Sequence, residues 1–279
     1  MKCPKCGHDV RDSERFCPVD QYDCGFPNVR AAQKHEEIRA LEERFQRAQE
    51  FAAGQGCSAV LNLFQDAVQS SQAVICRSLS IVKNFVSSDN ELYASFYQLV
   101  GMEARRPEDT STEYRRLVAD VLLFPYYFEQ IRFAALTLDG RGATGWGDCS
   151  MALREAPIRD RATVFEENSL YFSERMDLGV NRPVPPGYRA TWDRREKLAA
   201  AKLASFLRPD MTPAEFPQVI LRPAATPRGE DFIEVHVYGP LHRLNVERVA
   251  TRKPKKHDRA MIKELGRILG QVGAALEIY

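Results

Sequence analysis

Four cysteines near the N-terminus have the spacing that most clearly predicts chemistry in this chain. Two residues separate Cys3 from Cys6, and six separate Cys17 from Cys24. Thiolates two residues apart can bind one metal ion, and the glycine after the first pair lets backbone amides turn toward the sulfurs. Four thiolates around Zn²⁺ leave no open position for water. The spacing therefore predicts a structural zinc site with Cys3, Cys6, Cys17 and Cys24 as ligands.

The composition of residues 1–28 also favours a bound metal. This segment is rich in Gly, Pro and Asp and has few apolar residues, so it cannot bury a core of its own. The first cysteine pair and the Cys24-Gly25 ending resemble the zinc-ribbon family. The second pair departs from that family, whose second gap is usually two residues. His8 is an alternative ligand if Cys24 points away from the ion.

A predicted strand in the second half of the chain carries a second group of polar residues. Alternation along residues 232–238 places one set on each side of a strand. One face holds Phe232, Glu234, His236 and Tyr238, and the other holds Ile233, Val235 and Val237. The apolar face is expected to enter the core. Two interpretations remain for the other face, which is either a solvated strand surface or a site that uses its carboxylate and imidazole.

The strand with Glu234, its Gly239-Pro240 turn and the apolar segment that follows resemble the last third of bacterial mono-ADP-ribosyltransferases. The resemblance extends over residues 74–250 and implies an ADP-ribosyltransferase-like fold with NAD as substrate. It implies that Glu234 steadies the ribose and activates the acceptor. In such a reaction a carboxylate stabilises the positive charge that develops on the ribose as the nicotinamide bond breaks.

The same resemblance implies an arginine that binds NAD and a hydroxyl that shapes the pocket. Arg77, before Ser78, and Arg132 are the two candidates for the arginine, whose guanidinium would bind the diphosphate. Ser169 and Thr137 are the candidates for the hydroxyl. Phe232 stands where enzymes that modify arginine commonly have a second acidic residue. That difference favours nucleic acid or another acceptor over an arginine side chain.

Charge is spread unevenly along the chain. The 39 Lys and Arg residues nearly balance the 38 Asp and Glu residues, for a net charge of +1, so bulk charge does not predict nucleic-acid binding. Residues 248–279 hold eight basic and three acidic side chains, a net charge of +5. The Arg252–Arg259 cluster within them is either a solvated loop or a contact for the phosphates of RNA or DNA.

The pattern of elements predicts an α+β fold. We expect a zinc ribbon over residues 1–28, a helical connecting or body segment over 29–125, and a mixed β-sheet domain with helices over 126–279, catalytic if the protein is an enzyme. Helices are predicted over 29–53, 60–68, 91–102, 113–124, 192–206 and 259–269. Strands are predicted over 74–82, 131–138, 149–153, 162–165, 232–238 and 274–278.

Two functional hypotheses follow. The first is an NAD-consuming transferase that modifies a macromolecule, and the resemblance implies a toxin of a toxin–antitoxin or anti-phage system, with an antitoxin or other protein partner. The alternative is a non-catalytic adaptor whose zinc ribbon binds nucleic acid or protein. A hydrolase or nuclease that uses Glu234 and His236 ranks below both. No secretory signal or run of 18 apolar residues occurs, so we expect a cytoplasmic protein without membrane contact.

Overall fold

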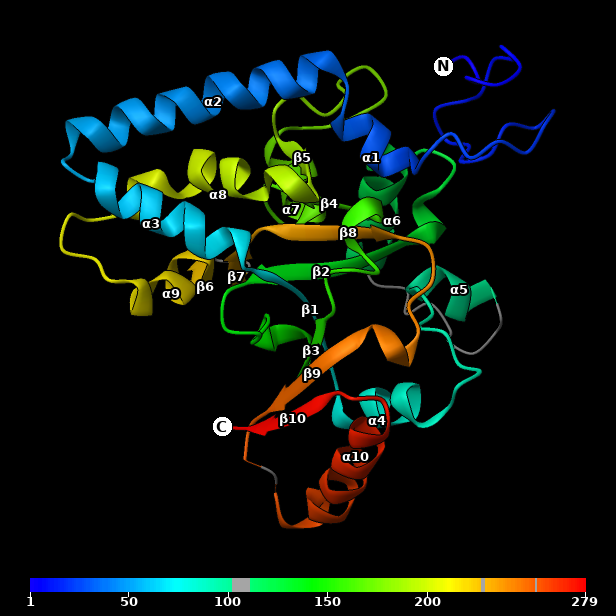
Figure 1. Cartoon of the computed structure of the whole chain (residues 1–279), viewed down its shortest axis with the longest axis vertical. Coiled ribbons are helices and arrows are strands. Elements are labelled where there is room, and N and C mark those ends of the chain that lie inside the picture. The colour runs from blue at the N-terminus through cyan, green and yellow to red at the C-terminus, as the bar shows by residue number, and fades with distance from the viewer. Residues whose placement is uncertain (102–110, 227–228, 254) are drawn as a thin grey trace.

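A computed structural model describes residues 1–101, 111–226, 229–253 and 255–279. It has an α+β body built on a large sheet, with a small N-terminal module of loops beside its first helix (Figure 1). The mixed α+β class is therefore as predicted. No helix in the described ranges is long and apolar enough to cross a bilayer.

The main sheet has eight strands in the order β10-β9-β3-β1-β2-β8-β4-β5. Its neighbours run antiparallel except for β9 and β10, which are parallel. A separate hairpin joins β6 to β7. The strands are β1 (Gln72–Arg77), β2 (Ile131–Thr137), β3 (Cys149–Leu153), β4 (Ala162–Phe165), β5 (Arg189–Thr191), β6 (Leu221–Thr226), β7 (Gly229–Phe232), β8 (Glu234–Tyr238), β9 (Val246–Thr251) and β10 (Ala275–Ile278).

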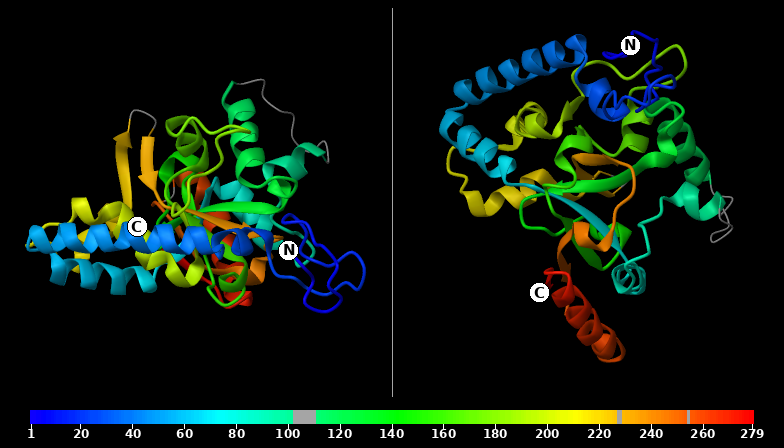
Figure 2. Two further views of the ribbon diagram at one scale, coloured as in Figure 1. Left: turned by 90° about the horizontal axis from the view of Figure 1, so that it is seen from above. Right: turned by 45° about the vertical axis from the view of Figure 1, so that its right-hand side comes forward.

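Helices cover both faces of this sheet. They are α1 (Pro27–Ala32), α2 (His35–Gly54), α3 (Ser58–Gln69), α4 (Leu79–Ser87), α5 (Phe96–Gly101), α6 (Ser111–Leu123), α7 (Ser169–Arg175), α8 (Arg195–Leu203), α9 (Phe216–Ile220) and α10 (Arg259–Gln271). The long helix α2 and helix α3 both pack on α8, and α10 packs on α4 at the opposite end of the molecule (Figures 1 and 2). Helices α6 and α7 pack on each other and contribute to a smaller aromatic cluster.

The alternation along β8 divides its side chains between two buried layers. Val235 and Val237 enter the main core with the residue before the strand, Ile233. On the other face Glu234 and His236 are each only 2% exposed. The interpretation of this face as a solvated strand surface is therefore wrong, because the aromatic cluster beneath α6 and α7 covers it.

Most predicted elements occur close to their predicted bounds, with several differences. The helix expected over 29–53 is divided into α1 and α2, and the strand expected over 232–238 is divided between β7 and β8 at Ile233. The strand expected over 74–82 ends at Arg77, and α4 begins at Leu79 after a single extended residue, Ser78. The helix expected over 91–102 is shorter, since α5 begins at Phe96. Residue 102, at the end of that predicted helix, lies outside the described residues. Strand β1 lies within the segment expected to be helical and occupies the middle of the main sheet.

Candidate functional site

The N-terminal module consists of two knuckles with the same backbone geometry. In the first, the Cys3 amide donates to the carbonyl of His8 and the Gly7 amide donates to the carbonyl of Cys3. In the second, the Cys17 amide donates to the carbonyl of Tyr22, five residues on, and the Gln21 amide donates to the carbonyl of Cys17. Residue Gln21 has a φ of 56° and Gly7 a φ of 73°. The second knuckle therefore repeats the first at an offset of 14 residues.

This repeat places Asp20 where the first knuckle has Cys6. One ligand atom from each of Cys3, Cys6, Cys17 and Asp20 lies within 4.8 Å of the others. The Cys6 and Cys17 sulfurs are 3.6 Å apart, and the Cys3 sulfur is 3.7 Å from Asp20 Oδ1. Three thiolates and a carboxylate oxygen are a donor set that Zn²⁺ accepts in tetrahedral geometry. This cluster could hold a metal ion and is compatible with zinc.

Three of the four predicted ligands, Cys3, Cys6 and Cys17, lie together in this cluster, and Cys24 does not. Cys24 is buried beside Cys3 and Cys17, but its sulfur lies 3.6 Å from the Tyr22 carbonyl and outside the four-residue group. The alternative ligand His8 is also outside the group. Asp20 does not follow from the spacing of the cysteines, on which the predicted ligand set depends. The repeated Cys-Pro-x-x motif at Cys3 and Cys17 is the signal that would have found it.

The two candidates for the fourth ligand predict different results on substitution. If Asp20 binds the metal, Asp20→Ala weakens zinc binding by at least about tenfold, since loss of even an outer partner of a ligand commonly costs that much. Cys24→Ser then changes the affinity less than about twofold. Competition with a chromophoric chelator measures both affinities. The opposite ranking would assign the fourth position to Cys24.

Two side chains of α1, Arg30 and Asn28, connect the metal module to the body. The guanidinium of Arg30 on α1 donates to five backbone carbonyls of the module, those of Arg11, Asp12, Glu14, Cys24 and Gly25. From the same helix, Asn28 donates to the carbonyl of His236 at 3.2 Å. Helix α1 therefore connects the metal module to strand β8.

Glu234 is the centre of a second, buried polar cluster. Its carboxylate accepts hydrogen bonds from the Ser169 amide at 2.9 Å and the Arg116 guanidinium at 3.2 Å, and lies 2.9 Å from His236 Nε2. Burial by itself would raise the pKa of Glu234. The charge of Arg116 and the hydrogen bond with His236 outweigh burial and lower that pKa to about 2. The carboxylate is therefore ionised near neutral pH.

Arg116 links this carboxylate to a second one. Its guanidinium lies 3.1 Å from Asp120 one turn along α6, and it donates to Asn168 Oδ1 at 3.3 Å. The Tyr97 hydroxyl donates to Asp120 at 2.6 Å. Burial raises the pKa of Asp120, although Arg116 acts against it. Two buried carboxylates thus share one guanidinium, which makes Arg116 the electrostatic centre of the cluster.

Aromatic rings surround the imidazole of His236. The ring centroids of Phe124, Phe133 and Phe165 lie 4.7, 5.4 and 5.5 Å from that of His236. A small space of about 10 Å³, lined partly by Phe124, Thr163 and Arg189, lies beside the imidazole. This space holds about one water molecule. The site as seen here is therefore closely packed.

The two predicted hydroxyl residues, Ser169 and Thr137, lie on the side of the sheet that carries Glu234. Ser169 lies against Glu234, and its hydroxyl is buried without a hydrogen-bond partner among the residues that the structure describes. The hydroxyl of Thr137 is also buried, and within the described ranges it has no hydrogen-bond partner. Thr137 lies on the same face of β2 as Ala135, which pairs with Glu234 in the sheet. Both predicted hydroxyls therefore retain unused hydrogen-bonding capacity on the sheet face that carries Glu234.

The two predicted arginines do not lie at Glu234. Arg132 projects from the opposite face of β2 and donates to the Tyr93 carbonyl at 3.0 Å and to Gln98 at 2.7 Å. Arg77 lies above the ring of Tyr93, with 5.6 Å from its guanidinium carbon to the ring centroid. The guanidinium that does contact Glu234 belongs to Arg116, which the sequence did not single out. The local sequence feature that points to Arg116 is Asp120, four residues later, with which it forms an ion pair along α6.

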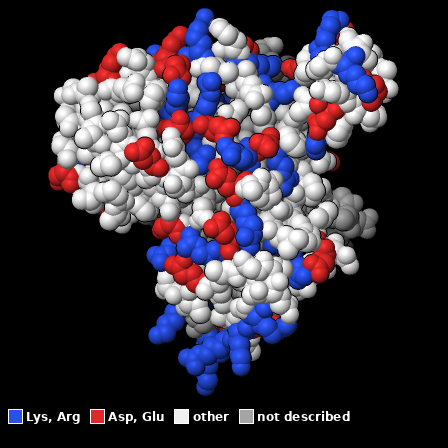
Figure 3. All heavy atoms as spheres, viewed as in Figure 1, with Lys and Arg blue, Asp and Glu red and all other residues white. Residues whose placement is uncertain are grey.

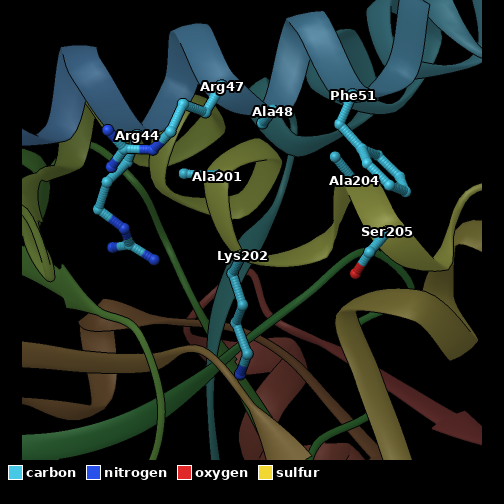
Figure 4. A pocket seen from close by; sticks show the side chains of 8 residues that line it. All are labelled: Arg44, Arg47, Ala48, Phe51, Ala201, Lys202, Ala204 and Ser205. Atoms are coloured by element: carbon cyan, nitrogen blue, oxygen red, sulfur yellow. The ribbon is translucent and has the colours of Figure 1, made fainter. Parts of the chain in front are cut away.

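A larger cavity of about 220 Å³ lies between α2 and α8, away from Glu234 (Figure 4). Arg44, Arg47 and Lys202 line it together with alanines and Phe51. Lys202 extends from α8 and pairs with Asp231 at 2.6 Å, and Arg44 pairs with Glu166. Two of its three cations are therefore neutralised by buried or half-buried carboxylates, so the cavity has less positive charge than its lining suggests.

The ionised state of Glu234 predicts a pH dependence of stability. A depressed pKa contributes stability that is complete above the unfolded value, about 4.3, and is lost as the pH falls through about 2. A shift of this size corresponds to about 3 kcal/mol. We expect Glu234→Gln to be less stable than the wild type by about that amount at pH 6. The difference should shrink toward pH 2 in urea unfolding, and a difference independent of pH would contradict the ionised carboxylate.

Comparison with known proteins identifies no relative from which a function could be transferred. No protein-family model matches the chain, and no curated protein matches its sequence. The geometry of the cysteine cluster and of the Glu234 cluster is therefore the basis for a proposed function.

Proposed function

We propose that this protein is an NAD-consuming, ADP-ribosyltransferase-like enzyme that modifies a macromolecule. The observation that carries the proposal is Glu234, an ionised carboxylate that is 2% exposed and held in place by Arg116, His236 and the Ser169 amide. A fixed negative charge in a dry site stabilises developing positive charge far more than it would in water.

The proposed reaction uses this carboxylate at the nicotinamide ribose of NAD. The bond between ribose C1′ and the nicotinamide nitrogen breaks, and its electron pair leaves with nicotinamide. The acceptor nucleophile forms a new bond to C1′, and its proton passes to solvent by way of the Glu234 carboxylate. Glu234 stabilises the oxocarbenium-like charge on the ribose during this exchange.

Two features of the surrounding chain support this role. The hydroxyls of Ser169 and Thr137 are buried on the face of the sheet that carries Glu234, without a hydrogen-bond partner among the described residues. A guanidinium lies at the proposed catalytic carboxylate, since Arg116 pairs with Glu234 at 3.2 Å. Because Arg116 already contacts the carboxylate, a sugar hydroxyl reaches Glu234 only when that contact opens.

Transfer of label from NAD tests the proposal. Wild-type protein incubated with NAD labelled in its adenylate phosphate and with a cell lysate should label macromolecules, and Glu234→Gln should not. Loss of the label on nuclease treatment would identify a nucleic-acid acceptor, and loss on protease treatment a protein. If the protein acts as a toxin, its expression arrests growth and Glu234→Gln relieves the arrest. Equal labelling by the two proteins would refute the role of Glu234.

A second candidate function is a protein-binding adaptor, and the surface of the metal module favours it. Four large apolar side chains are exposed there, Met1 (47%), Phe16 (45%), Val19 (63%) and Tyr22 (42%). Exposed apolar side chains gathered on one small module are typical of interaction surfaces. Under this proposal, Val19→Glu abolishes capture of a protein partner while the zinc content is unchanged. If Val19→Glu captures the partner as well as the wild type does, the module is not the binding surface and serves only to hold the N-terminus in place.

A further inference from the structure

Seven basic side chains gather at the end of the molecule formed by α10, where Figure 3 shows Lys and Arg side by side. We call this surface the basic tip; it consists of Arg252, Lys253, Lys255, Lys256, Arg259, Lys263 and Arg267. All seven residues are exposed. None of them forms an ion pair with any residue that the structure describes.

The acidic residues nearby do not neutralise the basic tip. Residues 252–267 contain seven Lys or Arg and two acidic residues, Asp258 and Glu264, which gives a net charge of +5. The carboxylate of Glu264 pairs at 3.0 Å with Lys83 on α4, and Asp258 lies 3.5 Å from His257. A concentration of unpaired cations repels itself and is stabilised by a polyanion, whose counterions are released on binding.

Helix α10 arranges part of this charge in a regular row. Arg259, Lys263 and Arg267 are four residues apart, so they lie on one face at intervals of about 6 Å along the axis. The opposite face buries Ile262, Leu265 and Leu269, so α10 is held in a fixed orientation. In the right-hand view of Figure 2 the helix extends away from the body of the protein. A partner can therefore approach its basic face.

We propose that the basic tip binds duplex DNA, with the basic face of α10 toward the major groove and its cations on the phosphates. The major groove of B-form DNA is about 12 Å wide and admits an α-helix, whereas the major groove of A-form RNA is too narrow to be read by side chains. Single strands are usually bound by stacking on aromatic side chains. Residues 252–267 contain no Phe, Tyr or Trp. Contacts with phosphates alone imply little sequence preference.

Binding of DNA at this surface stands apart from the transferase reaction. That the bound duplex is also the acceptor of ADP-ribose rests on the proposed function. If the protein binds DNA but transfers no ADP-ribose, the proposal for the basic tip stands and the proposed transferase activity is refuted. If the protein transfers ADP-ribose to lysate protein but does not bind DNA, the transferase proposal stands and the proposal for the basic tip is refuted.

Fluorescence anisotropy with a labelled 20-base-pair duplex tests the proposal on the full chain loaded with zinc. About five phosphate contacts predict a slope of about −4.5 for log affinity against log salt, and a loss of several hundredfold between about 50 and 200 mM salt. Lys256→Glu combined with Lys263→Glu should weaken binding more than tenfold and make the slope shallower by about 2. Arg39→Glu with Arg47→Glu, two exposed cations on α2, is the control with the same change in charge and should bind within about twofold of wild type.

Three outcomes would overturn the proposal. One is equal loss of binding in the two double variants, which would mean that only net charge matters. Another is tighter binding of single-stranded DNA or duplex RNA than of duplex DNA at the same salt concentration. The third applies if Lys256→Glu with Lys263→Glu weakens binding but also loses helix content. In that case, unchanged binding by Lys256→Gln with Lys263→Gln, which keeps the helix, would overturn the proposal.

Discussion

Removal of the metal by a strong chelator is expected to unfold the N-terminal module and leave the main sheet folded. The buried cluster of the module contains only Val10 and the three thiols of Cys3, Cys17 and Cys24, which is too little to offset its chain entropy. Binding of structural zinc supplies about 10–16 kcal/mol in comparable small modules at neutral pH. The eight-stranded sheet has its own extensive core and does not depend on this site.

Limited proteolysis followed by mass spectrometry measures this effect. Without metal, cleavage should occur rapidly at the basic residues Lys5, Arg11 and Arg15, and a stable fragment that begins near α1 should accumulate. Added zinc should restore protection, and added magnesium should not, because thiolates bind it poorly. Full protection of the module in a protein shown to contain no metal would contradict a metal-dependent fold.

Substitution of Glu234 by glutamine is expected to lower NAD turnover by about 100- to 1,000-fold. Glutamine has nearly the same shape but no charge, so it removes the stabilisation of the positively charged ribose and retains most of the packing. The lost stability of about 3 kcal/mol is smaller than the free energy of unfolding of most domains, about 5–15 kcal/mol, so the variant should remain folded. Circular dichroism at the assay temperature checks this.

Glu247 provides the matched control for this substitution. It lies on β9 of the same sheet, and its side chain is exposed rather than buried. Glu247→Gln should therefore retain turnover within about twofold of the wild type, as substitutions away from special features usually do. Ser169→Ala keeps the amide that donates to Glu234 and removes only the hydroxyl, which has no partner in the described part of the chain. A reduction in turnover for that variant would show that the hydroxyl contacts the substrate.

The metal centre shows how far spacing alone could predict a site. Cys3 and Cys6 were recognised because their gap matches a known knuckle, and Cys17 because it begins the second pair. The fourth position was assigned to Cys24 since thiolates dominate structural zinc sites. The backbone repeat that places Asp20 in the group could be read only by comparing the two segments residue by residue.

The sheet shows a different limit. Alternation along β8 was enough to predict that Glu234 and His236 share one face, because side chains on a strand alternate strictly. It could not predict that helices cover this face, since that depends on where α6 and α7 fold back. The bond between Arg116 and Glu234 joins residues 118 positions apart, and a single sequence contains no record of such a contact. The register between β2 and β8 shows that Arg132 lies on the face of the sheet opposite to Glu234, and alternation within one strand cannot predict that register.

Nicotinamide release from NAD tests the central proposal most directly, because it requires neither a known acceptor nor a partner protein. Purified zinc-loaded wild-type protein, Glu234→Gln and Glu247→Gln would be compared at one concentration, with and without duplex DNA. We predict release by the wild type and Glu247→Gln and a loss of at least about 100-fold in folded Glu234→Gln. Equal release by all three proteins, or none by the wild type under either condition, would contradict a transferase centred on Glu234.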